Sequence, residues 1–180
     1  MKIKRNDTIA AIIDVQQRLY PFIRENEILT DKLIRLIKGL KVLGIDIIVT
    51  EQYSKGLGNT ILPVQEAIGP YNHLEKMSFS CCGLNDFNQV LKESGKKNVI
   101  IGGIESHVCV LQTVIDLLEN GYQPIIIEDC VSSRNQNDKI IAIERMRKEG
   151  AIISTYESLL FELMDVSGTE EFKAISKIVK

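Results

Sequence analysis

The sequence has little of what small secreted scaffolds, structural zinc sites or membrane spans require. It contains four cysteines in 180 residues, no cysteine pair with zinc-finger spacing, and two histidines. A chain of this length buries roughly 70% of the surface that its unfolded form exposes, so it does not need disulfides. We therefore expect reduced cysteines and a cytoplasmic location. No apolar run approaches the roughly 20 residues that cross a bilayer, and the basic N-terminal segment continues as a strand pattern, not as a signal peptide.

The chain also lacks an excess of charge of either sign. Lys and Arg number 22, Asp and Glu number 24, and the formal net charge is −2. We therefore expect neither nucleic acid nor an anionic membrane as a partner. Hydrophobic residues make up 44% of the chain and charged residues 26%, which is ordinary for a globular protein. Without a linker, an internal repeat or a low-complexity segment, residues 1–180 are expected to form a single domain.

Short apolar segments alternate with longer amphipathic ones, which is typical of a parallel sheet covered by helices on both faces. The expected strands are Thr8–Ile13, Ile45–Thr50, His73–Lys76, Asn98–Ile101, Gln123–Glu128 and Ala151–Ser154. The expected helices are Ile28–Leu43, Leu84–Glu93, His107–Asn120 and Lys139–Lys148, with one or two more from Thr155 onward. Right-handed crossovers then give an α/β fold, a three-layer α/β/α sandwich with a six-stranded, mainly parallel, Rossmann-like sheet.

Chemically active residue types follow three of these strands. Asp14 comes directly after the first strand, Lys76 ends the third, and Cys109 follows the fourth by way of Gly102 and Gly103. In such folds ligands bind beyond the carboxyl ends of the strands, near the point where the strand order reverses. The sequence therefore predicts that a carboxylate, an ammonium group and a thiol share one crevice.

These three groups suit nucleophilic catalysis by a thiol. Lys76 and the first-turn amides of a helix both favour the thiolate, so we expect the pKa of Cys109 to fall from ~8.5 to between ~3.5 and 7.5. Asp14 could take up the thiol proton and return it to a leaving amine. Backbone amides at the turn could hold the developing oxyanion, and the paired glycines allow the tight backbone path that this turn requires.

Each of these residues also has an ordinary structural explanation. A cysteine between apolar residues is often only a small core residue, Asp14 could cap a turn, and Lys76 could be a solvated surface residue. His107 is only two residues from Cys109 and therefore faces another side of the helix. We place His107 in the first turn or at the pocket rim, and a Cys–His mechanism has little support. The remaining cysteines are taken as packing residues: Cys81, Cys82 and Cys130.

Five segments together resemble the isochorismatase-like cysteine hydrolase superfamily. They are IIDVQ, VTEQYSKGLG, the lysine in EKMSFS, IIGGIESHVCVLQT, and EDCVSSRNQNDKIIAIERMRKEGAIIST. The resemblance runs nearly end to end and looks closest to the isochorismatase domain-containing proteins. It implies a triad of Asp14 as base, Lys76, and Cys109 as nucleophile. It also implies a non-proline cis peptide between Ile104 and Glu105, and an oxyanion hole made by the backbone N–H groups of Glu105 and Cys109.

The sequence departs from two branches of that superfamily. Nicotinamidases carry an aspartate and histidines after the second strand to hold a metal, and here the aligned residues are Gln52 and Ser54. The resemblance therefore implies no metal and no cofactor, and it argues against nicotinamide. True isochorismatases lack the cysteine. We expect a homo-oligomeric cysteine hydrolase that cleaves a C–N bond of a small amide, or a related carbonyl compound, through a thioester. The expected pocket lining is Gln52, Tyr53 and Phe79, although core packing explains the two aromatic residues equally well.

Two other functions stay open at this point. One is a catalytically silent binding or interaction protein on the same fold, which the presence of all three site residues argues against. The other is a flavodoxin-type nucleotide-binding domain. That domain needs a phosphate-binding loop rich in Ser, Thr or Gly after the first strand, and the segment DVQQRLYPF offers none. The segment GGIESH likewise lacks the third glycine of a dinucleotide motif.

Overall fold

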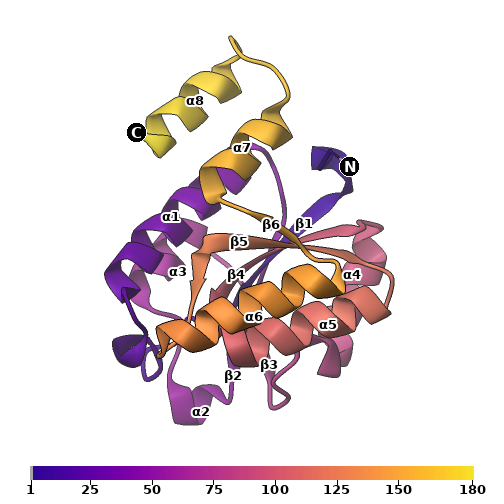
Figure 1. The fold of residues 1–180 in the computed structure, drawn as a ribbon. Helices are drawn as coiled ribbons and strands as arrows, with labels where there is room; N and C mark the ends of the chain where they lie inside the picture. Colours follow the sequence, from indigo (N-terminus) through magenta and orange to yellow (C-terminus); the bar gives the residue numbers. More distant parts are fainter. Residues whose placement is uncertain (1) are drawn as a thin grey trace.

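The protein is built around one parallel sheet of six strands, as a computed structural model of residues 2–180 describes it (Figure 1). The strand order is β3-β2-β1-β4-β5-β6, and every neighbouring pair is parallel. The strands are β1 (Thr8–Ile13), β2 (Ile47–Gln52), β3 (His73–Lys76), β4 (Asn98–Ile104), β5 (Gln123–Ser132) and β6 (Ile152–Ser154). The expected fold class, an α/β sandwich around a six-stranded parallel sheet, is confirmed.

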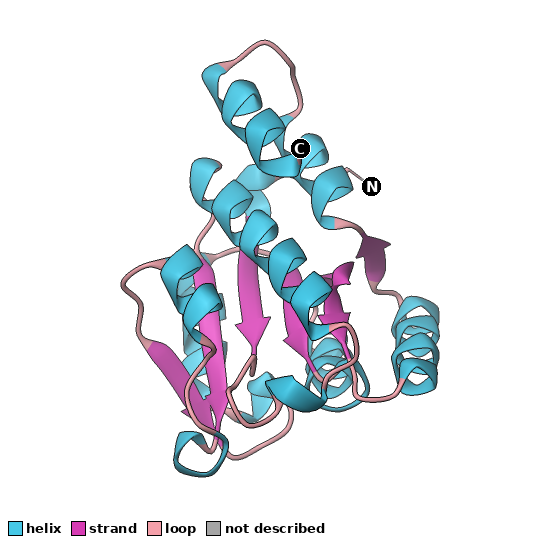
Figure 2. Cartoon of the chain, turned by 90° about the vertical axis from the view of Figure 1, so that its left-hand side faces the viewer, coloured by secondary structure: helices cyan, strands magenta, loops and turns pink. Residues whose placement is uncertain are grey.

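Helices lie on both sides of this sheet (Figure 2). One face carries α1 (Asn26–Val42), α3 (Leu62–Ile68), α7 (Tyr156–Met164) and α8 (Glu170–Val179). The other face carries α4 (Asn85–Ser94), α5 (Leu111–Glu119) and α6 (Gln136–Glu149). The short helix α2 (Ser54–Leu57) follows β2. No helix within residues 2–180 is long and apolar enough to cross a membrane.

The sequence folds this way because alternate residues of each central strand fill a different core. In β1, Ala10 and Ile12 pack in the cluster with α1, whereas Ile9, Ala11 and Ile13 pack in the cluster with α4 and α5. All six residues of β1 are buried. Side chains of successive strand residues point to opposite faces, so a strand covered on both faces must be apolar throughout.

Several element boundaries differ from the expected ones. Strand β2 is shifted by two residues toward Gln52, and β4 and β5 continue to Ile104 and Ser132. The predicted helix His107–Asn120 has two parts in the structure. Its first residues belong to a π-helical turn, Ser106–Val110, and α5 follows directly after this turn. Helices α2 and α3 were not predicted, because each is only one or two turns long and lies in a glycine-containing segment. The expectation of further helices after Thr155 is confirmed by α7 and α8.

The strand order reverses between β1 and β4. The chain leaves β1 toward α1 on one face of the sheet and leaves β4 toward α5 on the other face. The two connections diverge, so a crevice opens at the carboxyl ends of these two neighbouring strands. Asp14 and the π-helical turn Ser106–Val110 stand at that crevice.

Candidate active site

Two of the predicted site residues form a buried ion pair at the carboxyl edge of the sheet. Lys76 Nζ lies 2.6 Å from Asp14 Oδ2, and neither side chain is exposed to solvent. Strands β1 and β3 are not neighbours, because β2 runs between them. The two residues therefore meet by reaching over the end of β2, and neither the capping role for Asp14 nor the solvated role for Lys76 describes them.

The Lys76 ammonium group is fully bonded in this position. Besides Asp14, Nζ donates to the carbonyl oxygens of Ser78 at 3.1 Å and of Phe79 at 2.9 Å. An ammonium group has three N–H donors, and all three have partners. Burial is the largest single influence on the pKa of Lys76 and lowers it, but the Asp14 carboxylate and, to a smaller extent, Cys109 and Cys81 together outweigh it, so the pKa is raised from its ordinary value. Lys76 is therefore a fixed positive charge across the physiological range.

Thr50 of β2 completes the surroundings of the carboxylate. Its hydroxyl donates to Asp14 Oδ1 at 2.8 Å, and the Asp14 backbone N–H donates to the Thr50 carbonyl at 3.1 Å. Asp14 has a φ of 51°, in the left-handed region that is uncommon outside glycine. Both carboxylate oxygens of Asp14 are thus bonded, and its backbone turns away from the sheet at the site itself.

The Cys109 thiol lies in the π-helical turn and is 6% exposed. It donates to Gln52 Oε1 at 3.2 Å. Burial raises the pKa of Cys109 well above the ordinary value of a thiol, the Asp14 carboxylate raises it further, and Lys76 offsets only part of this. The predicted lowering of this pKa is therefore wrong, and Cys109 is a neutral thiol at neutral pH.

The segment before Cys109 has an unusual backbone. A non-proline cis peptide bond joins Ile104 and Glu105, as the family resemblance implied. Gly103 has a φ of 124°, and a Cβ atom on it would lie 2.1 Å from the carbonyl oxygen of Ile13 in β1. The Glu105 carboxylate accepts hydrogen bonds from the backbone N–H of Arg134 at 3.0 Å and from its Nε at 3.1 Å. This turn is therefore held against both β1 and the segment that leads into α6.

The expected pocket-lining residues all lie near the buried pair. Gln52 is the residue of β2 that pairs with Lys76 of β3, and it contacts the thiol. Tyr53 and Phe79 are 46% and 51% exposed, and Met77 beside Phe79 is 71% exposed. Core packing of Tyr53 and Phe79 is therefore excluded. The three exposed apolar side chains, Tyr53, Met77 and Phe79, are called the apolar rim below.

Histidine and the remaining cysteines take the minor roles expected of them. The ring of His107 lies in the first turn, with Nδ1 3.0 Å from Ser133 Oγ and Nε2 4.0 Å from a carboxylate of α6. Cys81 and Cys130 are fully buried and Cys82 is partly buried. Burial raises the pKa of Cys81 to about 11. The nearby Asp14 carboxylate also raises this pKa, and the Lys76 ammonium group lowers it in part. These cysteines are packing residues, as predicted.

Three polar residues of the site were missed by the sequence analysis. They are Gln16, Thr50 and Ser106, and all three are fully buried. The Ser106 hydroxyl has no hydrogen-bond partner within the described chain. Gln16 lies two residues after Asp14 in the segment IIDVQ, which was the only available signal for it.

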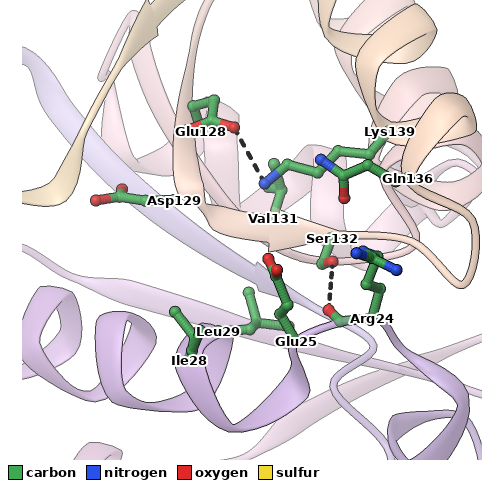
Figure 3. Close-up of a pocket in the computed structure, with 10 residues that line it drawn as sticks. All are labelled: Arg24, Glu25, Ile28, Leu29, Glu128, Asp129, Val131, Ser132, Gln136 and Lys139. Atoms are coloured by element: carbon green, nitrogen blue, oxygen red, sulfur yellow. Dashed lines mark hydrogen bonds and ion pairs between the residues drawn. The ribbon is translucent and has the colours of Figure 1, made fainter.

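A polar pocket near this edge is separate from the buried pair. It has a volume of about 260 Å³ and lies between the start of α1, the end of β5 and the start of α6 (Figure 3). Its charged lining includes Lys139, which pairs with Glu128 at 3.1 Å, and Asp129, whose pKa is raised by burial. None of Asp14, Lys76 and Cys109 lines it.

Residues 2–180 contain no cluster of three or more His, Cys, Asp and Glu side chains arranged to hold a metal ion. At the end of β2, the Gln52 side chain faces the thiol, and the Ser54 hydroxyl donates to Glu51 at 2.9 Å. Both positions are thus occupied by contacts within the protein.

Known proteins share both this sequence and this fold. Residues 8–158 match the isochorismatase domain. The chain is 46% identical over 143 residues to isochorismatase family protein 1B of Dictyostelium discoideum, covering 77% of this chain and 69% of that protein. It is 33% identical over 181 residues to isochorismatase domain-containing protein 2A of Mus musculus, covering 99% and 85%.

Two solved structures superpose closely on the chain. MAR1 ribonuclease of Caenorhabditis elegans has a TM-score of 0.93 at 35% identity, covering 99% of this chain and 92% of that one. The YcaC protein of Escherichia coli, described as an octameric hydrolase of unknown specificity, has a TM-score of 0.93 at 20% identity, covering 99% and 89%, and shows the fold alone. By sequence and by fold, the chain belongs to the isochorismatase family.

Proposed function

We propose that the protein is a cysteine hydrolase that cleaves the C–N bond of a small amide or a related carbonyl compound. Cys109 is the nucleophile, Asp14 the base, and Lys76 the cation that holds Asp14 in place. The observation that carries this proposal is the buried ion pair of Asp14 and Lys76, at 2.6 Å, beside a thiol at the switch point of the sheet. Burying two charges is costly, and such groups often mark functional sites.

The high thiol pKa determines how the first step proceeds. The thiol is neutral in the free enzyme, so it must lose its proton as its sulfur attacks the substrate carbonyl carbon. The S–H bond turns from Gln52 toward Asp14, and the carboxylate takes up the proton while Lys76 stays charged. A C–S bond forms, the carbonyl oxygen becomes an oxyanion, and the N–H groups of Glu105 and Cys109 are proposed to bind it.

The remaining steps return the site to its starting state. The tetrahedral intermediate collapses, the C–N bond breaks, and Asp14 gives its proton to the leaving nitrogen. The product of this half-reaction is a thioester on Cys109. Asp14 then takes a proton from water as the hydroxide oxygen attacks the thioester carbon, and the released thiolate regains that proton.

The surroundings of the thiol indicate the class of substrate. The charged residues described in this site are paired, Asp14 with Lys76 and Glu105 with Arg134, and the apolar rim lies at the same edge. We therefore propose an uncharged substrate with an apolar group next to its carbonyl carbon. We also propose a homo-oligomer, as the family resemblance implies, and four free cysteines suit the reducing cytoplasm.

The proposal is tested with a panel of small amides and the variants Cys109→Ala and Cys109→Ser. Hydrolysis by the wild type that falls at least about a thousandfold in Cys109→Ala supports covalent catalysis. Trapping with a slow substrate should add the acyl mass to the peptide that contains Cys109. Activity that survives the alanine substitution would contradict the mechanism. If the folded wild type binds but does not hydrolyse any amide in the panel, the silent binding protein becomes the better description.

Hydrolysis of RNA is a second candidate, because the chain is 35% identical over nearly its whole length to a protein named a ribonuclease. The formal net charge of −2 gives no general attraction for a phosphate backbone. Cleavage of labelled RNA oligonucleotides at low and moderate salt separates the two functions. A thiol nucleophile is not needed when the ribose hydroxyl attacks, so Cys109→Ala should retain RNA cleavage and lose amide cleavage.

A further inference from the structure

The sheet is incomplete at the place where the thiol makes its hydrogen bond. Strand β1 ends at Ile13, and the last bond of its ladder runs from the Asp14 N–H to the Thr50 carbonyl. Strand β2 continues for two more residues, to Gln52, and there pairs with Lys76 on its other side. The Gln52 peptide groups on the β1 side have lost their strand partner, and buried peptide groups need hydrogen bonds.

The side chain of Gln16 supplies these bonds. Its Nε2 donates to the Gln52 carbonyl at 3.0 Å, and its Oε1 accepts the Gln52 N–H at 2.8 Å. The second hydrogen of Nε2 goes to the carbonyl of Gly58 at 2.7 Å. Gln16 is not exposed at all. Both amide hydrogens and the amide oxygen are therefore used, and the carboxamide replaces one rung of the missing strand.

The next contact leads from Gln52 to the reactive group. Gln52 Oε1 accepts the S–H of Cys109 at 3.2 Å. We propose that Gln16 is a positioning residue for this site: by holding the main chain of Gln52, it sets the Gln52 carboxamide against the Cys109 thiol. The catalytic consequence rests on the function proposed above, whereas the effect on the thiol does not.

The effect on the thiol has a defined sign. A carbonyl oxygen that accepts the S–H bond stabilises the protonated form, and it has no favourable contact with a thiolate. Gln52 and Asp14 are the two acceptors available to this S–H. Losing the Gln52 acceptor, either directly or through release of its main chain by a change at Gln16, leaves only Asp14 and should therefore increase the thiolate fraction. The loss also frees the sulfur to adopt other rotamers, so it should reduce kcat for an amide while raising reactivity toward a small alkylating agent.

The test is a double-mutant cycle of Gln16→Met and Gln52→Ala. Methionine has nearly the shape of glutamine and no hydrogen-bonding amide, and it adds no charge beside the thiol. Iodoacetamide labelling of the Cys109 peptide is followed by mass spectrometry between pH 7 and 10, together with the urea midpoint of each variant. We expect each single variant to label about threefold faster at pH 8 than the wild type, and the double variant to label no faster than Gln52→Ala alone.

Stability should behave differently in the same cycle. Gln16→Met removes bonds to the main chain, which Gln52→Ala leaves in place, so its loss of stability should be the same in both backgrounds. A positioning role therefore predicts that the effects of the two substitutions on the labelling rate are not additive, whereas their effects on stability are additive. A residue with a purely structural role would give neither coupling nor a changed labelling profile.

Gln123→Met is the matched control, because Gln123 is a partly buried glutamine at the start of β5 whose amide donates to the Gly150 carbonyl at 3.0 Å, away from Gln16 and Gln52. It should label at the wild-type rate. Gln16→Asn, which keeps the amide but is one methylene shorter, serves if Gln16→Met does not fold. A folded Gln16 variant that labels at the wild-type rate, or an effect that adds in full to that of Gln52→Ala, overturns the proposal. Labelling needs no turnover, so failure of the hydrolase proposal would leave this test intact.

Discussion

Removing the Lys76 ammonium group is the most direct test of the buried ion pair. In Lys76→Met the aliphatic volume is largely kept, and the Asp14 carboxylate remains buried without its cation. Two unit charges 2.6 Å apart attract by about 6 kcal/mol at an effective dielectric constant of about 20, and desolvation offsets part of this. Removal of one partner from a buried pair typically costs about 3–5 kcal/mol, so we expect a loss of that size at pH 7.5.

The pH dependence of this loss gives a second observable. The pKa of Lys76 is raised in the folded protein, so its contribution is complete below the ordinary lysine value of 10.5 and is lost only as the pH rises through the raised value. The contribution of the pair is therefore complete at pH 7.5 and decreases as the pH rises above 10.5. The loss of stability in Lys76→Met should accordingly be smaller at pH 11 than at pH 7.5.

Urea unfolding followed by far-ultraviolet circular dichroism measures both quantities in a chain without tryptophan. The control is Lys173→Met. Lys173 also pairs with a carboxylate at 2.6 Å, that of Glu170, but with side chains 62% and 87% exposed, and its removal should cost less than about 1 kcal/mol. A loss below about 1 kcal/mol in Lys76→Met at pH 7.5, or an equal loss at pH 7.5 and pH 11, would refute the electrostatic reasoning.

Three further substitutions test other parts of the structure by urea unfolding. Gly103→Ala should cost more than about 2 kcal/mol, because its Cβ would meet the Ile13 carbonyl at a φ of 124°; a near-neutral result would contradict this close approach. Burial raises the pKa of Asp129, so its charge costs stability above the ordinary carboxyl range. Asp129→Asn still accepts the Tyr156 N–H and should raise the urea midpoint at pH 7.5 but not at pH 3. Ser106→Ala replaces a buried hydroxyl without a partner and should stabilise by about 1 kcal/mol, whereas a loss would indicate a bound water molecule.

The sequence predicts the fold and the ion pair because both depend on the ends of strands. Asp14 and Lys76 directly follow or end short apolar runs, and parallel strands bring such positions to one edge whatever the detailed register. Thr50 and Gln16 were missed because their contacts, unlike the ion pair, depend on the detailed register of the strands. Their contacts depend on which residue of β2 lies beside the end of β1. The expected second strand ended at Thr50, so the sequence did not indicate that the peptide groups of Gln52 need hydrogen-bond partners.

The thiol shows why correct placement does not give correct chemistry. Position alone suggested two influences on Cys109, the charge of Lys76 and the start of a helix, and both favour the thiolate. Burial opposes both, and its size depends on how closely the neighbouring elements cover the sulfur, which no local sequence pattern records. The Lys76 charge is moreover directed to Asp14 and two carbonyl oxygens. In the proposed mechanism, a buried neutral thiol requires a base fixed beside it, and Asp14 is held by Lys76 and Thr50 in the position that this base would need.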